Sequence, residues 1–141
     1  MAADPKSLVE RFYFEAWNEA NEGVAREILT EDFSFRGSLG PACEGVDGFI
    51  GYMRGIYEGV GNFGCEIEQL IVAGDKAAAR MRFSGIHKGS IFGVDPTGKE
   101  IAWSGAAFFS FYAGRISGLW VLGDIDDLKR QLGASGVNVF D

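Results

Sequence analysis

The sequence predicts an α+β fold in which helices lie on one face of an antiparallel sheet. Apolar residues recur with a period of about 3.6 up to residue 60 and with a period of 2 from residue 63 onward, so helices come first and strands follow. The 141 residues, of which 47% are hydrophobic, suffice for one hydrophobic core. We therefore expect a single domain over residues 1–141.

The first helix is expected over residues 7–21, where apolar side chains at helical spacing face away from charged ones. Ser7 and Glu10 fit a capping box at its start. Asp4 followed by Pro5 offers a second start one turn earlier, and both starts remain open at this point.

Two further helices are expected over residues 23–29 and about 46–58. The later helix carries an apolar stripe beside a stripe of glycines, namely Gly48, Gly51, Gly55 and Gly59. Because each interior glycine costs a helix about 1 kcal/mol relative to alanine, the glycine stripe indicates one of two situations. Either another element approaches this helix closely, or packing stabilises a helix that is weak by itself.

The second half of the chain alternates apolar and polar residues, which is typical of strands. Strands are expected over residues 63–72, 76–87, 100–112 and 115–122. Gly74-Asp75 and Ala113-Gly114 predict tight turns that would pair neighbouring strands in antiparallel orientation. A long loop is expected over residues 88–99, and a short C-terminal helix over residues 126–132.

Composition narrows the classes of function. Thirteen Lys and Arg against 20 Asp and Glu give a net charge of −7, which would repel phosphate backbones, so no nucleic-acid partner is expected. The sequence contains neither an apolar stretch of about 20 residues nor a signal-peptide pattern, and we expect a cytoplasmic protein with no membrane partner. Cys43, Cys65 and His87 have no metal-ligand spacing, so we expect no metal site. A disulfide between the two cysteines stays open.

Several glycine and turn motifs succeed one another after residue 80: Gly85-Ile86-His87-Lys88-Gly89, Phe92-Gly93, Pro96-Thr97-Gly98-Lys99, Gly114-Arg115-Ile116 and Gln131-Leu132-Gly133. In this order, and with helices before strands, the sequence resembles the SnoaL-like polyketide cyclases. These proteins, also called ester cyclases, belong to the nuclear transport factor 2-like superfamily. The resemblance covers about residues 7–133, which we expect to form the core of the domain.

The resemblance implies a cone: a strongly curved antiparallel sheet packed on three N-terminal helices, with a short C-terminal helix and an apolar cavity inside. It also implies an intramolecular aldol condensation that closes a polyketide ring without metal or cofactor. Such a reaction requires a base that takes a proton next to a carbonyl, and a dry pocket. In the family, a carboxylate on a strand serves as this base.

The sequence departs from the family at that position. The resemblance aligns the catalytic aspartate with Val121, and other polar pocket positions with Gly105, Ala107 and Leu119. A valine cannot transfer a proton. Three interpretations stay open: catalysis by a different group, a pocket that binds without catalysis, or a strand shifted in the alignment by a bulge.

Asp124 is the nearest replacement for the missing carboxylate, and His87 is the expected helper in proton transfer. Gly123 before Asp124 could let the chain bend and present this carboxylate at the cavity rim. The alternatives are that Asp124 caps the C-terminal helix and that His87 is a structural histidine.

Substrate-binding candidates are the aromatic residues of the expected core together with one arginine: Tyr13, Trp17, Arg36, Tyr52, Trp103 and Phe109. For the aromatic residues the alternative is that they only fill the core. For Arg36 the alternative is a surface salt bridge.

The sequence leaves three functions open. The first is a cofactor-independent lyase or isomerase of the cyclase kind, acting on a small hydrophobic carbonyl compound. The second is a non-catalytic domain that binds a small hydrophobic ligand, and the third is a dimerisation scaffold. We also expect a homodimer formed through the convex face of the sheet, where Phe108, Tyr112 and Trp120 would otherwise be exposed.

Overall fold

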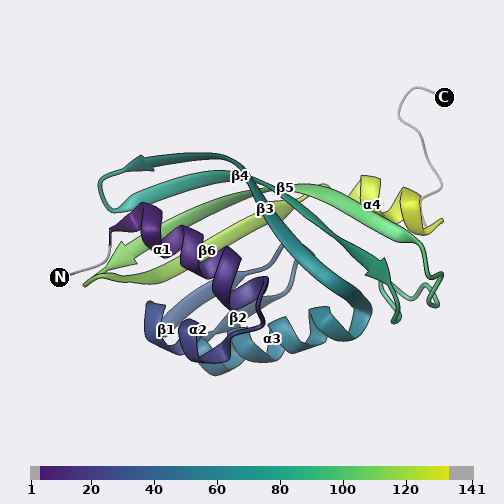
Figure 1. Ribbon diagram of the computed structural model, residues 1–141, viewed down its shortest axis with the longest axis horizontal. Coiled ribbons are helices and arrows are strands. Elements are labelled where there is room, and N and C mark those ends of the chain that lie inside the picture. Colours follow the sequence, from purple (N-terminus) through teal and green to yellow (C-terminus); the bar gives the residue numbers. More distant parts are fainter. Residues whose placement is uncertain (1–3, 134–141) are drawn as a thin grey trace.

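The computed structural model describes residues 4–133, which form helices and one six-stranded sheet. The helices are α1 (Pro5–Arg11), the π-helix η1 (Phe12–Trp17), α2 (Glu22–Ile28), α3 (Gly45–Gly59) and α4 (Ile125–Leu132). The strands are β1 (Leu29–Arg36), β2 (Ala42–Glu44), β3 (Val60–Ala73), β4 (Lys76–His87), β5 (Glu100–Tyr112) and β6 (Arg115–Gly123). In Figure 1 the curved sheet arches over α1, α2 and α3, and α4 lies at one end. The predicted α+β cone is confirmed.

The first helix begins at the earlier of its two predicted starts. Asp4 is the N-cap, because its Oδ1 accepts a hydrogen bond from the Ser7 backbone N–H at 2.8 Å, and Pro5 occupies the first turn. α1 continues directly into η1, where the Asn18 N–H donates to the Tyr13 carbonyl five residues earlier, at 2.9 Å. This π-helical widening is not visible in the apolar pattern, and widened turns of this kind frequently occur at functional sites.

The sheet order is β2-β1-β6-β5-β4-β3. Strands β3 to β6 pair in antiparallel orientation, and the turns at Gly74-Asp75 and Ala113-Gly114 lie where the sequence predicts them. One pair departs from the expected antiparallel sheet, because β1 runs parallel to β6 with Phe35 opposite Leu119. This pairing joins segments far apart in the sequence, so no local pattern could predict it.

Two side-chain amides bind the edges of strands. Asn18, which follows η1, accepts from the Cys65 N–H at 2.8 Å and donates to the Cys65 carbonyl at 3.0 Å on edge strand β3. Gln131 of α4 makes the same pair of bonds with Ala102 of β5, at 3.0 Å and 2.6 Å. Each amide hydrogen-bonds to the N–H and C=O groups of a strand residue as a neighbouring strand would, and so attaches a helix to the sheet.

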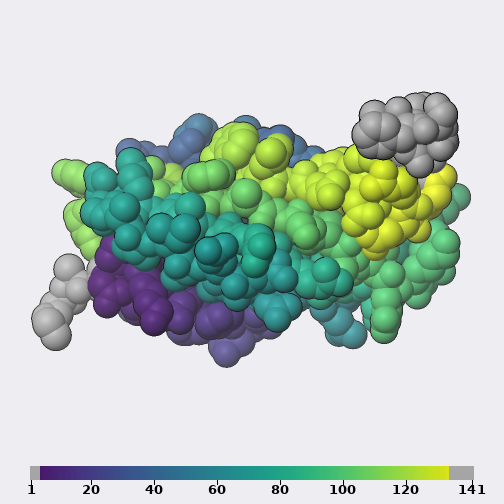
Figure 2. Space-filling view, turned by 90° about the horizontal axis from the view of Figure 1, so that it is seen from above, coloured from purple at the N-terminus to yellow at the C-terminus, as the bar shows by residue number. Residues whose placement is uncertain are grey.

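The two faces of the sheet differ. The inward face of β4 to β6 carries buried side chains that pack on the helices: Met81, Phe83, Trp103, Ala107, Phe109, Leu119 and Val121. The outward face of β5 and β6 exposes Phe108, Tyr112, Trp120 and Leu122. Figure 2 looks onto this convex face and shows the strands reaching the surface, with α4 at one end. Within residues 4–133, no helix is both long and apolar enough to cross a membrane.

Candidate functional site

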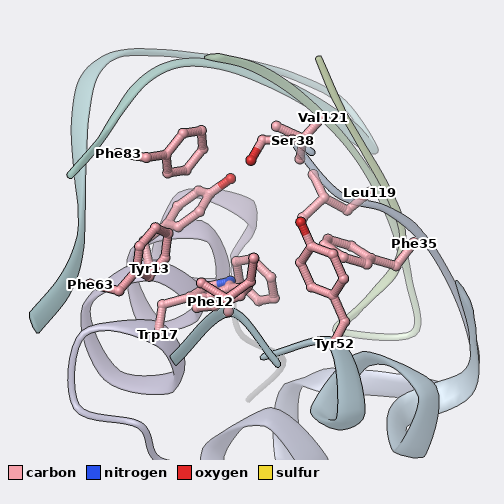
Figure 3. A pocket seen from close by; sticks show the side chains of 11 residues that line it. Phe12, Tyr13, Trp17, Phe35, Ser38, Tyr52, Phe63, Phe83, Leu119 and Val121 are labelled. Atoms are coloured by element: carbon pink, nitrogen blue, oxygen red, sulfur yellow. The ribbon is translucent and has the colours of Figure 1, made fainter. Parts of the chain in front are cut away.

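A cavity lies inside the cone, between the concave face of the sheet and the helices (Figure 3). Its wall consists almost entirely of aromatic and aliphatic side chains: Phe12, Tyr13, Trp17, Phe35, Ser38, Tyr52, Ile56, Phe63, Phe83, Leu119 and Val121. The space that a water-sized sphere can occupy is ≈ 20 Å³. Since one water needs about 10–15 Å³ by this measure, the cavity holds little more than one water molecule.

Each part of the wall is placed by a regular element. Tyr13 and Trp17 come from the widened turn η1, and Trp17 packs edge-on against Phe49 and Phe63 at 5.5 Å and 5.2 Å between ring centroids. Leu119 and Val121 face inward from β6 because alternate residues of a strand point to the same side. The π-helix and the pleat of β6 therefore bring the opposite walls together.

The hydroxyl of Tyr13 is the unusual polar group of the cavity. The Tyr13 side chain is 1% exposed, and its hydroxyl has no hydrogen-bond partner among the residues that the structure describes. In Figure 3 it points into the cavity, toward the side of Ser38. Desolvation raises the pKa of Tyr13 well above its usual range, so the phenol keeps its proton and is available as a donor.

The other two hydroxyls of the cavity already have partners. Burial raises the pKa of Tyr52 to about 12, although hydrogen bonds with the backbone of Leu39 and the side chain of Ser38 oppose the shift. Ser38 also accepts from the Trp103 indole N–H at 3.3 Å. Tyr52, Ser38 and Trp103 thus form a polar network beside an otherwise apolar cavity.

The six substrate-binding candidates fall into three groups. Tyr13, Trp17 and Tyr52 line the cavity. Trp103 and Phe109 are buried behind the lining, where Trp103 packs 5.7 Å from the Phe83 ring and Phe109 5.9 Å from the Tyr13 ring. Neither of these two side chains lines the cavity, as the core-filling alternative expects.

Arg36 does not belong to the cavity wall. Its guanidinium donates to the Val121 backbone carbonyl and lies 5.3 Å from the centre of the Trp120 ring. Because β1 pairs with β6, Arg36 lies opposite Trp120 in the register and stays with the strand backbone and the outer ring. The salt-bridge alternative also fails, since the structure records no ion pair of Arg36 within residues 4–133.

Asp124 caps α4, which was the alternative to a catalytic role for this residue. Its carboxylate is exposed and accepts from the Asp127 N–H at 3.2 Å in the first turn of α4. The chain turns into α4 directly after β6, so this carboxylate satisfies the new helix and does not line the cavity. The geometry therefore gives Asp124 a capping role.

His87 is fully buried but also lies outside the cavity wall. Its Nδ1 accepts from the Thr97 N–H at 3.2 Å and lies 2.9 Å from the Thr97 hydroxyl, because the loop after β4 folds back over the strand end. Its Nε2 has no partner among the described residues. No described contact joins His87 to Asp124, so the expected pair of proton-transfer groups is not assembled.

Acid, base and metal ligands are missing from the described cavity wall. None of its residues is an aspartate, a glutamate, a histidine or a lysine. Across residues 4–133 no three His, Cys, Asp or Glu side chains gather in a way that could hold a metal ion, and both cysteines are free. What the wall offers chemically is one free hydroxyl donor in apolar surroundings.

Sequence reasoning missed part of the wall. Phe83 lies on the inward face of its strand with His87, so period-2 alternation could have identified it. Phe12 and Ile56 follow the helical stripes in the same way. Ser38 lies in the turn after β1 and carries no pattern that would mark it.

The sequence and the fold are similar to those of known proteins. The sequence profile of the SnoaL-like polyketide cyclases matches residues 7–132. TsrD from Streptomyces laurentii is 29% identical over 92% of this chain and 94% of its own, with a TM-score of 0.81. A candidate polyketide cyclase from Bacillus cereus ATCC 10987 is also 29% identical, over 92% of this chain and 80% of its own, with a TM-score of 0.76.

A candidate SnoaL-like polyketide cyclase from Jannaschia sp. CCS1 shares the fold at 22% identity, with a TM-score of 0.81 over 98% of this chain and 99% of its own. No curated protein matches the sequence.

Proposed function

The chain belongs to the SnoaL-like polyketide cyclase family, and we propose that it binds a small hydrophobic carbonyl compound whose carbonyl oxygen enters the cavity. The carbonyl oxygen of the ligand accepts a hydrogen bond from the Tyr13 hydroxyl. Trp17, Phe63 and Phe83 provide apolar contacts around it. No protein acid or base is required for this function.

The observation that carries the proposal is the free hydroxyl of Tyr13. Buried polar groups are nearly always hydrogen-bonded, and one without a partner costs about 1–3 kcal/mol. Within the described residues, the hydroxyl of Tyr13 makes no hydrogen bond to any group of the wall. A ligand with an acceptor oxygen would remove this cost on binding, and because the phenol stays protonated, it favours a neutral carbonyl oxygen.

The second candidate function is cofactor-independent cyclisation, which membership of the family favours. A hydroxyl that donates to a carbonyl also stabilises the enolate formed when a neighbouring proton leaves. The base that removes this proton would have to come from outside the described wall or from the substrate. Binding of a carbonyl compound is common to both candidates, so it is the function to test first.

A pair of matched ligands tests the binding. 2-Pentanone and 2-methyl-1-pentene have nearly the same shape, but only the ketone has an acceptor oxygen. We expect the ketone to bind more tightly, as followed by tryptophan fluorescence, to which Trp17 of the cavity contributes. Tyr13→Phe should weaken ketone binding about 5- to 10-fold and leave alkene binding unchanged. Tyr112→Phe, which removes an exposed hydroxyl, is the control. Equal binding of the ketone by wild type and Tyr13→Phe would refute the role of Tyr13.

We further propose that two copies associate through the convex face of the sheet. Phe108 and Trp120 are cross-strand neighbours with ring centroids 5.9 Å apart, and they are 51% and 46% exposed. Leu122 and Tyr112 extend the same surface and are 51% and 73% exposed. A cluster of large apolar side chains on a sheet face usually marks an interface, and the same patch on a second copy would cover it.

A further inference from the structure

A second apolar space lies beside the glycine stripe of α3. A groove runs along the C-terminal half of α3 and is lined by Leu39, Pro41, Gly55, Ile56, Gly59, Val60, Ser90, Ile91 and Phe92. A water-sized sphere can occupy ≈ 250 Å³ of it, against ≈ 20 Å³ in the cavity. Serine is the only polar side chain in this lining.

The groove and the cavity are neighbours that share one lining residue. Ile56 lines both spaces. On the facing loop, Ser38 lines the cavity and the next residue, Leu39, lines the groove. The two spaces therefore adjoin at Ile56 and at the step of the loop from Ser38 to Leu39.

Glycine at position 55 leaves the groove open. A Cβ atom built there would meet nothing within 4 Å, so a larger side chain would project into free space. At Gly59 the situation differs, because an added Cβ would lie 3.2 Å from Ile91 Cγ1 of the opposite wall. That wall is held in place, since the N–H groups of Lys88 and Gly89 both donate to the Gly59 carbonyl at 3.0 Å.

We propose that the groove takes the apolar tail of the same compound whose carbonyl oxygen binds Tyr13. The ligand is then an elongated ketone or acyl compound, with its oxygen in the cavity and its chain along α3. The inference rests on the proposed function. Its physical basis is space: the cavity has room for about one water, which is enough for a carbonyl oxygen, and the rest of an organic ligand needs the groove.

A series of methyl ketones of increasing length tests the proposal: 2-pentanone, 2-heptanone and 2-nonanone. Each methylene that leaves water for an apolar site strengthens binding by about two- to fourfold. We expect 2-nonanone to bind wild type at least tenfold more tightly than 2-pentanone. Gly55→Leu, which fills the groove, should abolish this gain, so that 2-nonanone binds this variant no more tightly than 2-pentanone does.

Gly51→Leu is the matched control. Gly51 lies one turn earlier on the exposed side of α3, an added Cβ there also meets nothing within 4 Å, and it does not line the groove. Both leucines raise helix propensity equally, so a difference between the variants reports the groove. Ile91→Ala, on the other wall, should also reduce the gain with chain length, and it keeps the test open if Gly55→Leu does not fold.

The outcomes separate the two proposals. If 2-pentanone binds and Tyr13→Phe weakens it, but Gly55→Leu keeps the full gain for 2-nonanone, then the groove is not part of the site and only this inference is overturned. If Gly51→Leu and Gly55→Leu lose the gain equally, the groove is likewise excluded. If no ketone of the series binds, the proposed function is overturned together with the inference.

Discussion

Tyr13→Phe is expected to make the protein more stable. The substitution removes one buried oxygen and keeps the ring, which packs against Phe12 and Phe109 at centroid distances of 5.0 Å and 5.9 Å. The hydroxyl that disappears makes no hydrogen bond to a described residue, so no such bond is lost with it. Removing the oxygen removes the cost of its desolvation.

The size of the effect follows from that cost. An unpartnered buried hydroxyl costs about 1–3 kcal/mol, and the small space left by the missing oxygen offsets part of the gain. We expect the free energy of unfolding to rise by about 1 kcal/mol. For 141 residues this raises the Tm by about 3 °C. Thermal and urea unfolding followed by circular dichroism measure both quantities, and an unchanged urea m-value would show that the folded state is preserved.

Tyr52→Phe supplies the comparison, because it makes the same chemical change on the same cavity. The Tyr52 hydroxyl has hydrogen-bond partners at Leu39 and Ser38, so its loss should lower stability by about 1 kcal/mol. The two variants should therefore shift the Tm in opposite directions. A Tyr13→Phe protein that is less stable than wild type would show that the hydroxyl has a partner in the ligand-free protein, and the argument for an absent ligand acceptor would fail.

Four further predictions concern other parts of the molecule. Val121→Asp places an acid in the apolar wall, where burial raises its pKa. We expect a loss of stability of about 3 kcal/mol at pH 7 in unfolding experiments, a smaller loss at pH 4 where the acid is neutral, and faster deuterium exchange next to the carbonyl of 2-pentanone by NMR. Leu122→Asp, where the acid is exposed, should show neither the pH dependence nor the faster exchange. Asp124→Ala should lower the free energy of unfolding by about 1 kcal/mol, whereas Asp124→Asn should keep the cap and the stability. Neither variant should change the affinity for the ketone, and weaker ketone binding by Asp124→Asn would contradict the capping role. The pKa of Tyr52 is about 12 in the folded protein and about 10 in the unfolded chain, so the folded state keeps a proton that the unfolded state loses. The contribution of Tyr52 to stability should therefore be full below pH 10 and be lost between pH 10 and 12. Burial also raises the pKa of the Cys65 thiol, so the test is the comparison in which stability falls less steeply with pH in Tyr52→Phe than in wild type. Light scattering should give about 30 kDa for wild type, twice the 15.3 kDa chain mass, and the single-chain mass for Trp120→Glu; a monomeric wild type at micromolar concentration would exclude the dimer.

Local patterns predicted most of the fold. The strands expected over residues 76–87 and 100–112 have those bounds in the structure, because period-2 alternation and the turns at Gly74-Asp75 and Ala113-Gly114 are contained within a few neighbouring residues. The widened turn η1, the strands β1 and β2, and the parallel pairing of β1 with β6 were not predicted. These features depend on contacts between segments far apart in the chain.

The candidate site could likewise be predicted only in part. The sequence could nominate Tyr13, Trp17 and Tyr52, since an aromatic residue on an apolar stripe faces the interior. It could not tell which hydroxyl finds a partner, because that depends on the turn around Ser38 and on the backbone of Leu39. For Asp124 the local signal was sufficient, as an aspartate before a helix caps it.

The hydroxyl of Tyr13 connects the structure with the proposed function. Phenylalanine at position 13 would keep the ring contacts and remove an unfavourable buried group, so stability alone gives no reason for a tyrosine there. Proteins retain such destabilising groups where function needs them. The hydroxyl of Tyr13 makes no hydrogen bond to a described residue, and the space beside it admits an atom the size of a water oxygen. A ligand oxygen fits both conditions, and it accounts for a tyrosine in a position where packing favours phenylalanine.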